Sequence, residues 1–213
     1  MNILNDFKFG KNIIGVDEVG RGCLAGPVFA AAIKLDQNIF PKGINDSKKL
    51  NKHQRMKIFK ELTSKCEYSI GIASVKEIEK FNILQSSLLA MNRALEKINI
   101  KDYVILVDGN FSPDKNKNIK TIIKGDQKCI SIAAASIIAK VSRDLLMEKL
   151  SIKFPNYNWE KNYGYGTKKH LEAIKKFGIT EHHRKTFSPI HNLLSNDIVV
   201  SKFKYFLWLF LKY

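Results

Sequence analysis

The sequence predicts an α/β fold with a mixed β-sheet flanked by helices. Short apolar runs that are typical of strands alternate along the chain with longer segments of helical periodicity. Hydrophobic residues make up 45% of the 213 residues, which is enough for a sizeable core. We find no internal repeat and no low-complexity linker. Together these observations predict one layered domain in which helices pack on a sheet.

The predicted strands are short apolar or alternating runs. They cover residues 12–16, 28–35, 68–75, 103–107 and 120–123. The connection between the first two contains three glycines and Pro27, which predicts a turn. The fourth strand runs into Asp108-Gly109-Asn110, and the fifth into Lys124-Gly125-Asp126. Each of these strands therefore ends in a polar turn that could carry functional side chains.

The predicted helices have apolar residues at helical spacing. They cover residues 52–65, 83–98, 131–149 and 170–177. The third is the longest, and its Ala133-Ala134-Ala135 run allows close packing against a sheet. The segment 163–167 contains two glycines and predicts a loop.

The chain divides, in our interpretation, into a main domain of residues 1–192 and an apolar tail of residues 193–213. Residues 198–213 are too few for a membrane span, which needs about 20 apolar residues, and lysines interrupt them. We expect the tail to fold back as a packed helix, which makes a small helical C-terminal extension. A segment that binds a partner or a membrane surface is the alternative.

The charge of the chain indicates a polyanionic partner. The formal net charge is +16 and the pI is about 9.7, which favours nucleic acid or an anionic membrane surface. The abundance of Lys, Asn and Ile offers a second explanation, a biased composition. The N-terminus lacks the pattern of a signal peptide, and three widely spaced cysteines argue for a reducing cytoplasm. Because no apolar heptad is present, we expect a monomer.

Four acidic residues follow or end apolar runs close to glycines: Asp17, Glu18, Asp108 and Asp126. Strand ends converge at one edge of an α/β sheet, so these acids can meet in one place. Clustered carboxylates require cations, and oxygen ligands favour Mg²⁺ or Mn²⁺ over zinc. Two such ions about 4 Å apart would suit phosphodiester hydrolysis. The alternative is that these acids are ordinary turn and capping residues.

Several motifs together resemble the ribonuclease HII family, the bacterial type 2 ribonuclease H. They occur in the order of the family and cover about residues 12–192. The matching segments are Gly15-Val16-Asp17-Glu18-Val19-Gly20-Arg21-Gly22, Asn45-Asp46-Ser47-Lys48-Lys49-Leu50, Val107-Asp108-Gly109-Asn110, Lys124-Gly125-Asp126, residues 131–141, Gly164-Tyr165-Gly166-Thr167 and Thr180-Glu181-His182-His183-Arg184.

The resemblance implies a ribonuclease H-like fold and an endonuclease. Its expected activity is hydrolysis of the RNA strand of RNA–DNA hybrids and cleavage 5′ to single ribonucleotides in duplex DNA, which leaves 5′-phosphate and 3′-hydroxyl ends. The implied catalytic and metal-binding residues are Asp17, Glu18, Asp108 and Asp126, which would hold two Mn²⁺ or Mg²⁺ ions.

The resemblance also implies how the substrate is recognised. Backbone groups of Gly20, Arg21 and Gly22 would contact the 2′-hydroxyl, the group that distinguishes RNA from DNA. Tyr165 would pack on the deoxyribose of the next nucleotide. Candidate phosphate contacts are Lys48, Lys49, Lys124 and Arg184. Without the resemblance, Tyr165 would be taken as a packing residue and the lysines as a solvated surface.

Some residues depart from the family pattern or invite another interpretation. Cys23 stands where the family usually has proline, and its oxidation near the site is a weaker hypothesis. His182-His183 lacks further spaced ligands, so we expect a structural or substrate-proximal His183 and no zinc. We interpret Lys140 and Arg143 as a solvated helix face. The rival functions are a ribonuclease HIII-like enzyme and a catalytically inactive, basic nucleic-acid-binding module.

Overall fold

The computed structural model describes residues 6–35, 43–44, 50–114 and 118–195. Within this part of the chain, a five-stranded sheet has the order β3-β2-β1-β4-β5. The strands are β1 (Ile13–Val19), β2 (Val28–Leu35), β3 (Tyr68–Ala73), β4 (Val104–Asp108) and β5 (Ile119–Ile122). The first three pair antiparallel, whereas β1, β4 and β5 are parallel. The predicted α/β fold with a mixed sheet is therefore confirmed.

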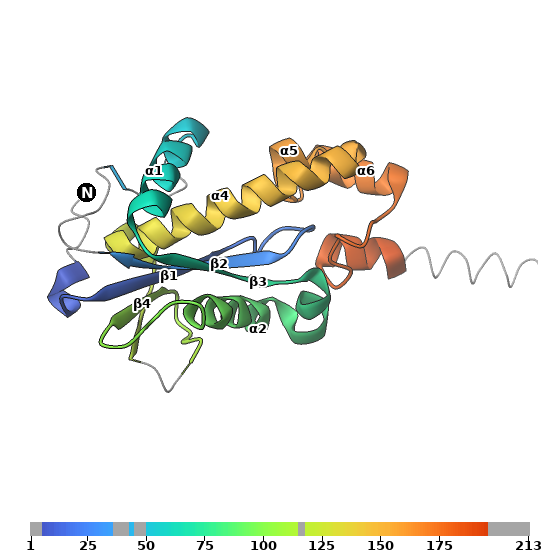
Figure 1. Cartoon of the computed structure of the whole chain (residues 1–213). Helices are drawn as coiled ribbons and strands as arrows, with labels where there is room; N and C mark the ends of the chain where they lie inside the picture. Colours follow the sequence, from blue (N-terminus) through green and yellow to red (C-terminus); the bar gives the residue numbers. More distant parts are fainter. Residues whose placement is uncertain (1–5, 36–42, 45–49, 115–117, 196–213) are drawn as a thin grey trace, which may run out of the picture.

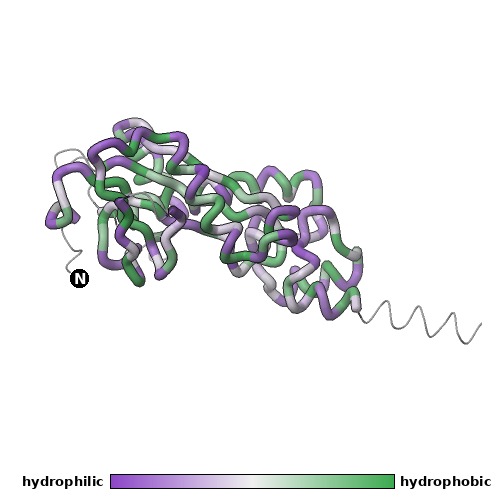
Figure 2. Tube along the Cα trace, turned by 90° about the horizontal axis from the view of Figure 1, so that it is seen from below, coloured by the Kyte–Doolittle hydropathy of each residue, from purple (hydrophilic) through white to green (hydrophobic). Residues whose placement is uncertain are grey.

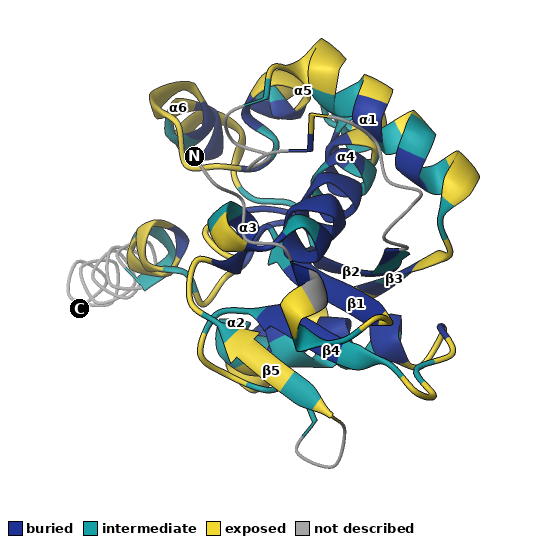
Figure 3. Ribbon diagram, turned by 90° about the vertical axis from the view of Figure 1, so that its left-hand side faces the viewer, coloured by how far each residue is buried: buried dark blue, intermediate teal, exposed yellow. Residues whose placement is uncertain are grey.

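Helices cover both faces of the sheet. The helical elements are η1 (Asp6–Phe9), α1 (Lys52–Lys65), α2 (Val75–Leu95), α3 (Gly125–Lys128), α4 (Ile130–Lys153), η2 (Pro155–Tyr157), α5 (Trp159–Asn162) and α6 (Lys168–Phe177). Helices α1 and α4 lie on one face, and α2 lies on the other (Figure 1). Helix α4 is buried along most of its length, whereas α1, α6 and β5 present exposed residues to solvent (Figure 3).

The alternation of side chains along β1 assigns its residues to the two faces. Ile14 and Val16 pack in the core beneath α2. Gly15 faces α4, because a Cβ atom at this position would overlap the backbone of Ser131. By the two-residue period of a strand, Asp17 follows Gly15 toward α4, and Glu18 follows Val16 toward the α2 face.

The boundaries of two elements correct the sequence predictions. Strand β1 continues through both carboxylates to Val19, because its pairing with β2 extends to the Val19–Phe29 pair. Helix α2 begins at Val75, which we had predicted to end a strand, because Ser74 caps the helix in a capping box with Glu77. A left-handed residue, Asn82 (φ 66°), then kinks α2, and its side chain caps the second half.

A third hydrophobic cluster lies beyond the sheet. It joins Leu24 and Ala25, from the loop after β1, to residues that follow the middle of α4, including Trp159 and Ile174. Figure 2 shows that the molecule is elongated, with this part at the end away from the N-terminus. The predicted tail helix falls mostly on residues 196–213, outside the described residues, and the division at residue 192 stays a prediction. Within the described part of the chain, no helix combines the length and apolar character that crossing a membrane requires.

Candidate active site

The fold brings the four predicted carboxylates together. Because β1 and β4 are parallel neighbours, with Val16 opposite Val107, their ends place Asp17 beside Asp108. The amide of Gly125 donates to Asp108 Oδ1 at 2.6 Å, which brings the following Asp126 to the same place. We call Asp17, Glu18, Asp108 and Asp126 the carboxylate cluster. Asp126 lies in the short α3, although the sequence predicted only a turn there.

Burial and neighbouring carboxylates raise the pKa of Asp17 and Glu18. Burial, followed by the charges of Glu18 and Asp108, raises the pKa of Asp17 well above its usual value, and Asp126 adds to this effect. Burial also raises the pKa of Glu18, although the guanidinium of Arg21 opposes that shift. Two carboxylates of the cluster, Asp17 and Asp126, are each only 6% exposed. Negative charge is therefore concentrated where water screens it poorly.

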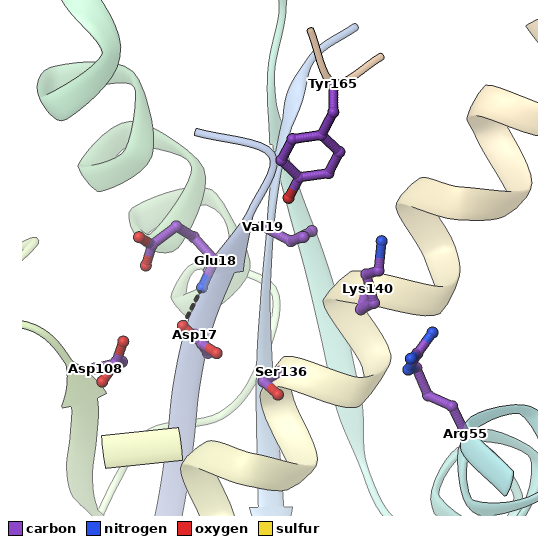
Figure 4. Close-up of a pocket in the computed structure, with 8 residues that line it drawn as sticks. All are labelled: Asp17, Glu18, Val19, Arg55, Asp108, Ser136, Lys140 and Tyr165. Carbon is purple, nitrogen blue, oxygen red and sulfur yellow. Dashed lines mark hydrogen bonds between the residues drawn. The ribbon is translucent and has the colours of Figure 1, made fainter. Parts of the chain in front are cut away.

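The orientation of the carboxylates decides whether they form a ready cation cage. Asp17 Oδ1 accepts the amide of Glu18 at 2.7 Å, and Glu18 Oε1 pairs with Arg21 Nη1 at 3.1 Å. In Figure 4 the Asp17 and Glu18 side chains leave β1 in different directions. Consistent with this, no group of three or more His, Cys, Asp or Glu side chains in the described residues is arranged to hold a metal ion.

The chemistry of the cluster nevertheless fits a hard divalent cation. Its donors are all carboxylate oxygens, the ligands that Mg²⁺ and Mn²⁺ prefer. The positive charge of a cation would also offset the cost of ionising Asp17, which burial and neighbouring carboxylates impose. The donor set therefore fits such a cation by its chemistry.

The carboxylates line one side of a pocket whose other side is basic and polar. In Figure 4, Asp17, Glu18 and Asp108 lie on the β1–β4 side, whereas Arg55 from α1 and Lys140 from α4 lie opposite. The complete lining is Asp17, Glu18, Val19, Arg55, Asp108, Ser136, Lys140 and Tyr165. Arg55 and Ser136 had no predicted role. Among the described residues, Ser136 Oγ is buried without a hydrogen-bond partner, a feature that no sequence pattern reveals.

The loop after β1, residues 20–26, which we call the glycine loop, contains glycines with different surroundings. Gly20 has a left-handed φ of 94°, and a Cβ there would overlap the guanidinium end of Arg143. Gly22 is exposed, and a Cβ there would meet no atom of the described residues within 4 Å. Gly20 therefore serves the packing of the loop, whereas the backbone at Gly22 is open to a ligand. Arg21 lies between them with a side chain that is 49% exposed.

Arg184 corrects the prediction of a direct phosphate contact. It is fully buried, and its guanidinium donates to the carbonyls of Gly20, Arg21 and Gly26 at 2.6–2.9 Å. Because these donors are directed into the protein, Arg184 stabilises the glycine loop. Burial lowers its pKa to about 10, which leaves it charged at neutral pH.

Arg143 also differs from the sequence interpretation, which placed it on a solvated face. It is fully buried and donates to the carbonyls of Pro27, Tyr163 and Ala25 at 2.8–3.0 Å. We call Arg143 and Arg184 the arginine clamp. Sequence spacing could not find it, because its partners are carbonyls that lie far away along the chain.

Tyr165, for which the resemblance implies packing on a sugar, lies in the same pocket as three of the carboxylates. It is 41% exposed and lines the pocket, and Lys140 Nζ lies 5.9 Å from its ring centroid.

Cys23 is fully buried, so its predicted oxidation near the site does not fit its position. Lys124 is exposed, whereas Lys48 and Lys49 lie outside the described residues.

His183 has a structural position, which was one of its two predicted roles. It is fully buried, and its Nδ1 accepts the amide of Thr180 at 2.9 Å. Its Nε2 lies 3.2 Å from His170 Nε2. This histidine pair was not visible in the sequence, where His170 stood alone on a short helix.

Comparisons with known proteins identify the family and the fold of the chain. A family model described as ribonuclease HII matches residues 14–190. A ribonuclease HII of Pelagibacter ubique is 58% identical over 185 residues, which cover 86% of this chain and 100% of the relative. The crystal structure of the ribonuclease H2 from Pyrococcus horikoshii superposes with a TM-score of 0.72 at 27% identity, and covers 87% of this chain and 98% of that one. The Bst-RNase HIII crystallised with Mn²⁺ has the same fold, with a TM-score of 0.68 at 21% identity over 86% of this chain and 69% of that one.

Proposed function

The chain belongs to the ribonuclease HII family, and on that premise we propose that it hydrolyses the RNA strand of RNA–DNA hybrids and cleaves on the 5′ side of single ribonucleotides in duplex DNA. The observation that carries the proposal is the meeting of four carboxylates beside an open glycine loop in a chain of this family. The products would be 5′-phosphate and 3′-hydroxyl ends.

The carboxylate cluster is the proposed metal site. Asp17, Glu18, Asp108 and Asp126 would hold two divalent ions, Mn²⁺ or Mg²⁺, and a fold relative crystallised with Mn²⁺ supports this choice. Such ions would supply an activated water and neutralise charge on the scissile phosphate. The protein contributes a buried, negatively charged edge that attracts cations. It also contributes Arg21, whose bond to Glu18 controls where that carboxylate points.

The glycine loop and Tyr165 are the proposed readers of the sugar. The exposed Gly22 backbone can approach a 2′-hydroxyl without hindrance from a side chain. Tyr165 lines the same pocket as Asp17, so its ring can pack on the sugar of the neighbouring nucleotide. Together with Gly20 and Arg21, these residues would select the junction between a ribonucleotide and a deoxyribonucleotide.

Phosphate contacts complete the proposed substrate surface. Lys124 remains a candidate because it is exposed and lies two residues before Asp126. Lys48 and Lys49 remain candidates on the resemblance alone. The net charge of +16 supports a nucleic-acid partner. The cytoplasmic location and the monomeric state also remain predictions.

The decisive experiment uses a DNA duplex that carries one ribonucleotide, with Mn²⁺ or Mg²⁺ present. We expect a single cut on the 5′ side of the ribonucleotide, and no cut in an all-DNA duplex. The Asp108→Asn variant should bind but not cleave, whereas a matched change of an exposed acid on α6, Glu172→Gln, should cleave normally. Binding by the wild-type protein without cleavage would favour the inactive nucleic-acid-binding module and refute the proposal.

A further inference from the structure

Two fully buried histidines, His170 and His183, form a pair. The pair adjoins the loop of residues 163–167, which we call the Tyr165 loop. The pair comes from α6 and from the segment after it, and the rings of Trp159 and Tyr157 pack around it. Neither histidine lines the pocket that contains the carboxylates. Because buried polar groups are normally retained with specific partners, the partners of this pair indicate its function.

The hydrogen-bond partners fix the tautomer of both rings. His183 Nδ1 accepts the amide N–H of Thr180 at 2.9 Å, so its proton resides on Nε2. His170 Nδ1 lies 2.8 Å from the carbonyl oxygen of Tyr165, which can only accept, so this nitrogen carries the proton of His170. The single lone pair of His170 Nε2 is then shared between two donors, the indole N–H of Trp159 at 3.0 Å and His183 Nε2–H at 3.2 Å.

The result is a directed chain of hydrogen bonds that ends at Tyr165. It runs from the Thr180 amide through His183 and His170 to the Tyr165 carbonyl. The next residue after His183 is Arg184, whose guanidinium holds the carbonyls of Gly20 and Gly26. The same short segment is therefore bonded to the glycine loop on one side and, through the histidines, to the Tyr165 loop on the other.

Only neutral rings can maintain this chain. A second proton on His170, at Nε2, would face the N–H of His183. A second proton on His183, at Nδ1, would face the amide N–H of Thr180. Burial lowers the pKa of both histidines, which agrees with neutral rings at physiological pH. The pair therefore acts as a fixed link between uncharged rings.

We propose that His170 and His183 are positioning residues that set the Tyr165 loop relative to the glycine loop and so contribute to the recognition of a single ribonucleotide. This inference rests on the proposed function, in which Tyr165 packs on the sugar. It predicts a role in substrate selection for two residues that do not touch the pocket.

The test compares two substrates, a duplex with one ribonucleotide and a long RNA–DNA hybrid. The quantity measured is the ratio of kcat/KM for the first substrate to kcat/KM for the second. His170→Leu removes both ring nitrogens and should lower this ratio by about tenfold, within the range for a small misplacement near a reaction site. Tyr165→Ala should lower it at least as much. The double variant should match Tyr165→Ala, because His170 acts only through Tyr165.

Matched variants separate positioning from general damage. His170→Asn can place an N–H near the Nδ1 position and should keep most of the wild-type ratio. His191→Leu, at an exposed histidine, should leave it unchanged. His183→Phe keeps a ring of similar size and removes its nitrogens, so it provides the test if His170→Leu does not fold.

The outcomes distinguish this inference from the proposed function. If the wild-type protein cleaves neither substrate, the proposed function fails. If Tyr165→Ala lowers the ratio but His170→Leu and His183→Phe do not, only the positioning inference fails. A further loss in the double variant would also overturn it. In ¹⁵N spectra of the wild-type histidines we expect protons on His170 Nδ1 and His183 Nε2, and the opposite tautomer at His170 would contradict the hydrogen-bond chain.

Discussion

The carboxylate cluster and the arginine clamp both adjoin the loop that follows β1, but their buried charges have opposite surroundings. Each guanidinium of the clamp donates to three different backbone carbonyls. In the carboxylate cluster, Asp17 is buried beside other carboxylates, and their charges raise its pKa. The hydrogen bonds of the clamp satisfy its guanidinium groups within the protein, whereas burial and neighbouring carboxylates oppose ionisation of Asp17 in the carboxylate cluster.

The difference separates what holds the fold from what performs chemistry. A buried charge with complete hydrogen bonding fixes the groups around it, and the clamp fixes the loop that presents Gly22. A buried charge that is repelled by its neighbours destabilises the protein until a ligand of opposite charge binds. We therefore expect substitutions in the two regions to change stability in opposite directions.

The largest expected effect is the loss of activity in Asp17→Asn. We expect cleavage to fall by about 10³-fold or more, as for loss of a group that stabilises charge in a transition state. The same change removes a repelled charge, so the melting temperature in EDTA should rise. Cleavage assays and thermal unfolding on one preparation test both parts. A variant that loses stability as well as activity would contradict the comparison.

The largest expected effect on stability is that of Arg184→Met. It leaves the carbonyls of Gly20 and Gly26 without donors, and we expect a loss of about 3–5 kcal/mol in the free energy of unfolding. Urea unfolding measures this loss. The control is Arg21→Met, whose half-exposed side chain should contribute less than about 0.5 kcal/mol. Equal effects of the two changes would show that the clamp does not hold the loop.

Gly20 and Gly22 flank Arg21, and substitutions at the two positions should separate an effect on packing from an effect on substrate recognition. Gly20→Ala introduces a Cβ at a left-handed position beside Arg143, and we expect a loss of about 2 kcal/mol. Gly22→Ala has open space, so its stability should change by less than about 0.5 kcal/mol. We expect Gly22→Ala instead to weaken cleavage at a single ribonucleotide. Normal cleavage by a folded Gly22→Ala protein would argue against contact between this backbone and the substrate.

The sequence predicted the carboxylate cluster better than the clamp. Asp17, Glu18 and Asp108 were predicted from the convergence of strand ends at one edge of the sheet, and the parallel pairing of β1 with β4 produces this convergence. Arg184 could not be placed, because a lysine or arginine near a motif has the same pattern whether it faces phosphate or carbonyls. Its partner Gly26 lies 158 residues away along the chain. The kink at Asn82 was missed for a related reason, since a left-handed asparagine interrupts no apolar pattern.

The smallest expected effect is a difference in how stability depends on pH. For Asp17, the pKa is raised on folding from 3.8, so the folded metal-free protein binds more protons than the unfolded chain. Its contribution to stability therefore falls as the pH rises from about 4. For His183, burial lowers the pKa from 6.5 to about 3. Here the unfolded chain binds more protons, so stability falls as the pH decreases below 6.5 and continues to fall toward 3.

Asp17 and His183 should therefore contribute opposite slopes to the dependence of stability on pH. These slopes apply between about pH 4 and 6.5, the interval between the ordinary pKa values of Asp and His. In EDTA, Asp17→Asn should make stability rise more steeply with pH than in the wild-type protein, because it removes the falling contribution. His183→Phe should make the slope less positive, because it removes the rising one. Urea unfolding across this interval measures both slopes. If both variants shifted the slope in the same direction, the buried acids and the buried histidines would not differ in proton binding as their surroundings require.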